Sequence, residues 1–148
     1  MAVKNDFRHT VRACYAGYIT QAAVNNFAPL LFLTFQREYG IPLTQIGMLI
    51  TINFFTQLMT DLLSAKFADR IGYRKCAVGA HIFAAVGLLG LGIFPEIFPT
   101  PFMGLIAAVI LYAVGGGLIE VLVSPIVEAC PGDAKSGAMS LLHSFYCW

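Results

Sequence analysis

Two acidic side chains stand inside long apolar stretches of this sequence. Asp61 lies in INFFTQLMTDLLSAKF and Glu120 in LYAVGGGLIEVLVSPIVE. If each stretch is a helix that crosses a membrane, each acid lies about 17 residues, or roughly 25 Å, into it. An aspartate near the centre of such a helix costs about 2.5 to 3.5 kcal/mol, and ionisable residues at that depth usually mark ion or substrate pathways. Asp61 and Glu120 are therefore predicted to bind a solute or carry a proton; the alternative is a structural acid, neutral or paired with a neighbouring helix.

Polar and small residues recur at four-residue spacing around both acids, so each series occupies one helix face. The two series are Tyr112, Gly116, Glu120, Ser124 and Glu128, and Asn53, Gln57, Asp61 and Ala65. Three consecutive glycines, residues 115–117, leave space for a ligand or a neighbouring helix, and Pro125 permits a bend. The amides suit hydrogen bonds to solute hydroxyls, and they equally suit helix contacts of about 0.6 to 2 kcal/mol.

A third polar face is expected in the first apolar stretch. Tyr18, Gln21, Asn25 and Pro29 share it, with Asn26 beside them. Near the other end of the chain, His143 can reach the same cavity as a hydrogen-bond donor or proton partner, or it can be satisfied by packing alone. We therefore predict that Gln21, the two asparagines and His143 belong to the same site as the acids.

The segments that must position these residues are unusually apolar. Hydrophobic residues make up 58% of the 148 residues and charged residues 11%, against about 25% charged in soluble domains. Residues 13–35, 44–67, 76–94 and 102–129 each approach or exceed the roughly 20 residues that cross a membrane, and residues 138–148 begin a fifth run that reaches only halfway. A soluble core would leave four such helices uncovered. The fold class is therefore an all-α integral membrane bundle, with four helices and the start of a fifth.

Basic residues gather on one side of this expected membrane protein. Eight lie on one side, and they are Lys4, Arg8, Arg12, Lys66, Arg70, Arg74, Lys75 and Lys135. The other side has Arg37 alone. By the positive-inside rule the N-terminus faces the cytoplasm. We expect a multi-pass protein of the inner membrane, with lipid as a partner and no nucleic acid.

Residue spacing gives no indication of a metal, a cofactor or an enzyme. The cysteines, Cys14, Cys76, Cys130 and Cys147, have no CxxC spacing, and the three histidines are far apart. No HExxH motif and no phosphate-binding glycine loop with a lysine is present. We expect no cofactor and no enzymatic activity, and cysteines that act as small apolar side chains.

The charged stretch SAKFADRIGYRK separates the second apolar segment from the third. It resembles the G-x-L-a-D-R-x-G-R-K loop between helices two and three of the major facilitator superfamily, with Ala65 for the first glycine and Tyr73 where a basic residue is usual. The resemblance implies a cytoplasmic gating loop that contains Asp69, Arg70, Gly72 and Arg74. In such carriers the aspartate lies at the N-terminus of a helix from the other half, where a carboxylate gains roughly 0.3 to 1 kcal/mol.

The same resemblance assigns a partner to the basic residues of this loop. A loop arginine pairs with an acid at the cytoplasmic end of helix four, which in this sequence is Glu128. Because Tyr73 cannot form that ion pair, Arg70 or Arg74 is expected to do so.

The stretch GGGLIEVLVSP resembles helix four of the fucose permease branch of that superfamily, where a glutamate helps to bind sugar and carry a proton; here it is Glu120. The closing SLLHSFYCW is similar to the start of helix five in the same branch. That branch has an acid in helix one, where this sequence has Asn25 and Asn26. Its two-acid proton mechanism would therefore need Asp61 as the second acid.

These observations predict a secondary transporter in which residues 1–148 supply part of an N-terminal six-helix half. The missing C-terminal helices would be partners within the same chain, and the solute site would lie between the halves. The substrate is expected to be a small polar solute, namely a sugar, with proton coupling as an option. The alternatives are a drug exporter of the same superfamily and a complete four-helix membrane protein, such as an oligomeric exporter or pore.

Overall fold

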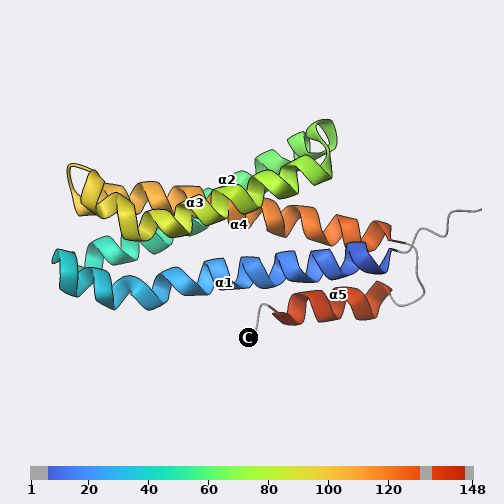
Figure 1. The fold of residues 1–148 in the computed structure, drawn as a ribbon, viewed down its shortest axis with the longest axis horizontal. Helices are drawn as coiled ribbons and strands as arrows, with labels where there is room; N and C mark the ends of the chain where they lie inside the picture. The colour runs from blue at the N-terminus through green and yellow to red at the C-terminus, as the bar shows by residue number, and fades with distance from the viewer. Residues whose placement is uncertain (1–6, 131–134, 146–148) are drawn as a thin grey trace, which may run out of the picture.

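Five helices form one bundle in the computed structural model, which describes residues 7–130 and 135–145. They are α1 (Arg8–Tyr39), α2 (Leu43–Ile71), α3 (Tyr73–Ile97), α4 (Pro101–Ala129) and α5 (Lys135–Ser144). Helices α1, α3 and α5 run in one direction, and α2 and α4 in the other (Figure 1). The described residues contain no strand, so the all-α prediction is confirmed.

The helix bounds differ from the expected ones mainly by extending beyond the apolar runs. The last part of the expected run 138–148 lies outside the described residues, as do Lys4 and Cys147. Within the described chain, three segments are long and apolar enough to cross a membrane: Leu43–Ser64, Tyr73–Ile97 and Pro101–Ala129. Helix α1 has 32 residues but is not apolar enough to join them, because its middle carries Gln21, Asn25 and Asn26.

Two short links fix the directions of the first three helices. Gly40 ends α1 in the left-handed conformation, with φ of 62°. A single residue, Gly72, separates α2 from α3, and its φ of 94° is a conformation that glycine adopts without steric cost. The start of α1, the α2–α3 link and the end of α4 lie together at one end of the bundle (Figure 1). We call this the basic end, because Arg8, Arg12 and Arg70 through Lys75 lie there.

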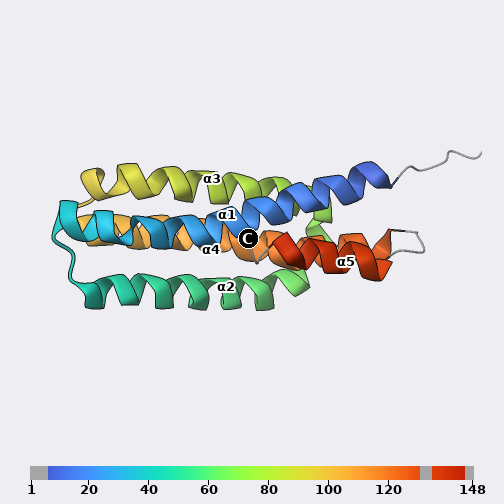
Figure 2. The same ribbon diagram turned by 90° about the horizontal axis from the view of Figure 1, so that it is seen from below.

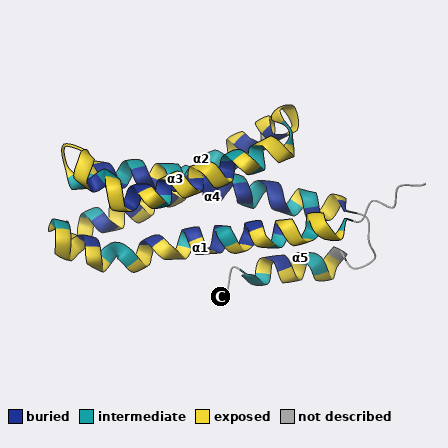
Figure 3. Ribbon diagram, in the orientation of Figure 1, coloured by how far each residue is buried: buried dark blue, intermediate teal, exposed yellow. Residues whose placement is uncertain are grey.

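Helix α4 is the centre of the bundle and contacts the other four helices. It lies between α2 and α3 in Figure 2, and it is the most continuously buried helix in Figure 3. Glycines bring α3 against it: a Cβ added at Gly87 would overlap the backbone of Tyr112, and one added at Gly115 would overlap the backbone of Ala84. Small residues allow close backbone approach between membrane helices.

The buried apolar side chains form two clusters, one toward each end of the bundle. The cluster toward the basic end includes Tyr18, Ile119 and Leu142. The other includes Val24 and Val109. The segments of α1, α2 and α4 between these clusters carry the buried amides and the two acids. We call this zone the polar layer, and it consists of Gln21, Asn25, Gln57, Asp61 and Glu120.

Candidate functional site

The first contact of the polar layer joins α1 to α4. Nε2 of Gln21, whose side chain is fully buried, donates to Oε2 of Glu120 at 3.0 Å. Gly116 lies one turn before Glu120 on the same face, and a Cβ added there would lie 2.8 Å from Oε1 of Gln21. The absence of a side chain at Gly116 therefore lets Gln21 lie across α4 and reach the carboxylate.

The second contact joins α2 to α1. Nε2 of Gln57 donates to Oδ1 of Asn25 at 2.6 Å, and Gln57 is also buried. Its Nε2 would lie 3.2 Å from a Cβ added at Gly116. Amides from two helices therefore meet over the same glycine of α4.

The third contact places Asp61 beside α4. A Cβ added at Gly117 would lie 3.0 Å from Oδ1 of Asp61. Asp61 and Glu120 lie at similar depths because α2 and α4 are parallel and each acid lies roughly 27 to 29 Å from the start of its helix.

Three buried oxygen atoms of this region have no hydrogen-bond partner among residues 7–130 and 135–145. They are Oε1 of Gln21, Oδ1 of Asn53 and Oδ1 of Asp61. All three accept hydrogen bonds or bind cations. Buried polar atoms are nearly always paired in folded proteins. These three oxygen atoms can therefore accept hydrogen bonds from a bound solute, or bind a group with positive charge.

A cavity of about 250 Å³ adjoins the polar layer on the side away from the basic end. Its lining comes from α1, α2 and α4, and the residues are Asn25, Asn26, Pro29, Phe32, Ile50, Asn53, Phe54 and Tyr112. We call it the asparagine cavity. Asn25, which accepts the bond from Gln57, connects this cavity to the polar layer.

The three asparagines of this lining are among the site residues predicted from the sequence, whereas its aromatic residues are not. Tyr112 belonged to a four-residue series, and nothing in the sequence distinguished Phe32 and Phe54 from lipid-facing phenylalanines.

His143 lies near the polar layer but bonds another residue. Its Nδ1 and Oη of Tyr18 share a hydrogen bond of 2.9 Å, and the two rings meet edge-on with centroids 5.4 Å apart. Tyr18 lies one turn before Gln21 on α1. The structure therefore brings His143 to the side of the site, where it is hydrogen-bonded to Tyr18.

The loop residues lie at the basic end, away from the polar layer. Tyr73, the departure from the superfamily pattern, donates from Oη to Oδ1 of Asp69 at 3.0 Å. This bond is local, because the two residues are four apart across Gly72. The expected ion pair of Arg70 or Arg74 with Glu128 stays a prediction.

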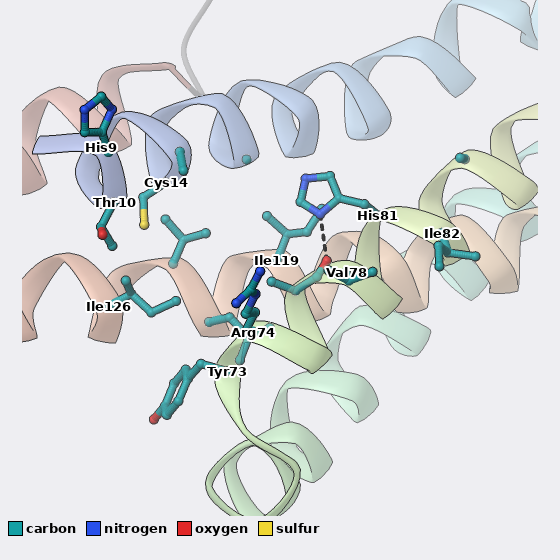
Figure 4. A pocket seen from close by; sticks show the side chains of 16 residues that line it. His9, Thr10, Cys14, Tyr73, Arg74, Val78, His81, Ile82, Ile119 and Ile126 are labelled. Carbon is teal, nitrogen blue, oxygen red and sulfur yellow. Dashed lines mark hydrogen bonds between the residues drawn. The ribbon is translucent and has the colours of Figure 1, made fainter. Parts of the chain in front are cut away.

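A larger groove of about 920 Å³ runs between α1, α3 and α4. Figure 4 shows its lining, with Arg74 and His9 near the basic end and aliphatic side chains such as Ile82 and Ile119 along the rest. Nδ1 of His81 is bonded to the carbonyl oxygen of Ala77 at 2.7 Å. The groove is mainly apolar, so the asparagine cavity is the better candidate for a polar solute.

Metal-binding side chains do not gather in the described part of the chain, where no group of three His, Cys, Asp or Glu residues is close enough to hold a metal. Cys14, Cys76 and Cys130 are free thiols.

We predict that Gly72→Ala destabilises the protein more than Tyr73→Phe. An alanine at φ of 94° is strained by about 1 to 3 kcal/mol, whereas the Tyr73 bond is exposed, so that water can replace the hydrogen bond when it is lost. Thermal unfolding of the purified variants in detergent measures both. An equal or larger loss in Tyr73→Phe would show that the bond to Asp69, and not the glycine, holds the α2–α3 link.

Comparison with known proteins gives a family match over nearly the whole chain. The model of the Major Facilitator Superfamily matches residues 14–148. No curated protein and no solved structure matches the chain.

Proposed function

The chain belongs to the major facilitator superfamily of membrane transporters, and from this we propose that it carries a small polar solute, namely a sugar, through the asparagine cavity. The observation that carries the proposal is the polar layer with its adjoining cavity inside an otherwise apolar bundle. Amide groups both donate and accept hydrogen bonds, which matches the hydroxyl groups of a sugar. Resemblance of GGGLIEVLVSP to the fucose permease branch supports the same substrate class.

Glu120 is the proposed coupling group. Its Oε2 accepts the hydrogen bond from Gln21, and a proton placed on that oxygen would weaken the contact between α1 and α4. Binding of a proton would thereby change how two helices of the solute pathway pack. Asp61 is the proposed second acid, in place of the acid that the fucose permease branch carries in helix one.

The proposal includes alternating access between this bundle and further helices of the same protein. The basic end would face the cytoplasm of a cell with an inner membrane, with Asp69, Arg70, Gly72, Arg74 and Glu128 as the gating region. The gathering of the α1 start, the α2–α3 link and the α4 end at one end of the bundle supports this orientation (Figure 1). Sequencing the transcript through and beyond the Trp148 codon tests whether further membrane segments follow.

Binding of radiolabelled monosaccharides tests the substrate class. We expect the purified protein to bind a hexose or a deoxyhexose, and Asn53→Leu to weaken that binding roughly three- to tenfold, because one or two hydrogen bonds are lost. Thr51→Val is the matched control: Thr51 is an exposed residue of the same helix whose hydroxyl bonds the carbonyl of Gly47. Binding of lipophilic cations in place of sugars would instead favour the drug exporter.

A further inference from the structure

The groove between α1, α3 and α4 is separate from the proposed solute pathway. Its volume is about 920 Å³, and it shares no lining residue with the asparagine cavity or the polar layer. On α1 it is lined by small side chains, those of Ala13 and Cys14 and the hydrogen atom of Gly17, which leave the space open. The groove is therefore available to a ligand other than the transported solute.

The groove has the depth of one leaflet of a membrane. Its lining on α3 begins at Tyr73, the first residue of that helix, and ends at Ala85, which is roughly 18 Å along the axis. A hydrocarbon core is about 30 Å thick, so one leaflet supplies about half of that. Within the groove, the ring of His81 is already bonded through Nδ1 to the carbonyl oxygen of Ala77. A further membrane helix would need a contact surface across both leaflets, whereas an acyl chain needs one.

The groove has a basic group at the end where α3 begins. Figure 4 shows the guanidinium group of Arg74 extending from the start of α3 toward the aliphatic side chains. Thr10 and His9 line the same end from α1, and no aspartate or glutamate is among the described residues of the lining. The planar guanidinium group of an arginine binds phosphate oxygens in pairs, and a hydroxyl or an imidazole N–H donates to them as well. This end therefore suits an anionic phosphate group.

We propose that the groove binds one anionic phospholipid, with an acyl chain along the aliphatic side chains and the phosphate at Arg74. The charge of the surrounding surface is complementary, because Arg8, Arg12, Arg70 and Lys75 belong to the same basic end. Anionic lipids are concentrated in the cytoplasmic leaflet and attract basic residues at its surface, which agrees with the proposed orientation. The lipid site does not depend on the sugar proposal, so either proposal can fail alone.

Native mass spectrometry of the detergent-purified protein with added dioleoyl phosphatidylglycerol tests the site. Dioleoyl phosphatidylcholine has the same chains without net charge, and we expect the protein to retain one phosphatidylglycerol at lower lipid concentration. Arg74→Gln should weaken phosphatidylglycerol binding roughly fivefold, which is the usual contribution of one basic residue to the binding of anionic lipid. Lys75→Gln is the matched control, because it removes the adjacent charge at an exposed position outside the groove and should bind lipid as the wild type does.

A second pair of variants tests the apolar part of the groove. Ala13→Phe places a ring in the groove and should reduce retention of phosphatidylglycerol, whereas Ala16→Phe, at an exposed position of α1 outside the lining, should not.

Three results on the wild-type protein would overturn the proposal without any variant. Equal retention of the two lipids would show unspecific lipid contact. Displacement of phosphatidylglycerol by an equal concentration of inorganic phosphate would show an anion site that takes no acyl chain. Absence of retained lipid on a protein with a helical circular dichroism spectrum would show that the groove is empty or covered by another helix.

Discussion

Gly115→Ala is expected to disrupt the packing of α3 on α4. The added Cβ would overlap the backbone nitrogen of Ala84, and it would lie 2.6 Å from the backbone carbonyl oxygen of Ala80. Backbone atoms cannot turn aside as a flexible side chain can, so the two helices must separate. Overpacking of this kind costs about 1 to 3 kcal/mol or more. Thermal unfolding of the detergent-purified variant should show a midpoint several degrees below that of the wild type, or little folded protein at all.

Gly92→Ala on α3 is the control for this experiment. A Cβ at that position meets nothing within 4 Å, and alanine is preferred to glycine in a helix by up to about 1 kcal/mol. We expect the control to unfold at the same temperature as the wild type or a higher one. A similar loss of stability in both variants would mean that α3 does not tolerate alanine for reasons unrelated to its contact with α4.

Glu120→Gln is expected to lower coupled solute transport roughly 10- to 100-fold while leaving the protein folded. The glutamine has nearly the same shape, and its carbonyl oxygen can still accept the hydrogen bond from Gln21. It has no charge and does not take up a proton. A hydrogen bond or ion contact to a charged group contributes about 1.5 to 3 kcal/mol, which sets the expected range. Uptake of labelled solute into proteoliposomes with and without an imposed ion gradient measures the effect.

Glu96→Gln provides the comparison for Glu120→Gln. Glu96 is an exposed acid near the end of α3, at the end of the bundle away from the basic end. Its neutral variant should transport as the wild type does. Unchanged gradient-driven uptake in Glu120→Gln would show that Glu120 has a structural role only, as an acid that is neutral or paired with a neighbouring helix.

The sequence was sufficient to predict the helices and the faces that carry polar residues. Apolar run length predicted the four long helices and their order, and four-residue spacing placed Gln57 with Asp61 and Gly116 with Glu120. The contacts across helices could not be predicted in this way. The bonds from Gln21 to Glu120 and from Gln57 to Asn25 depend on how three helices rotate against one another, which the period of one helix does not specify.

Two local features, the bond from Tyr73 to Asp69 and the length of α1, also could not be predicted from the sequence. The bond from Tyr73 to Asp69 crosses Gly72, whose conformation decides whether the two side chains meet; the resemblance alone directed Asp69 toward another helix. Helix α1 extends well beyond its apolar run at both ends, because helix formation continues through polar residues after the hydrophobic run has stopped.

The run of three glycines in α4 has a mechanical consequence. Each glycine faces a different neighbour: Gly115 meets α3, Gly116 meets Gln21 and Gln57, and Gly117 meets Asp61. A screw motion of α4 by one residue, roughly 1.5 Å along the axis with a rotation of about 100°, would put the side chain of Leu118 or Val114 against one of these neighbours. Helix α4 is therefore expected to move together with its neighbours and not to turn against them.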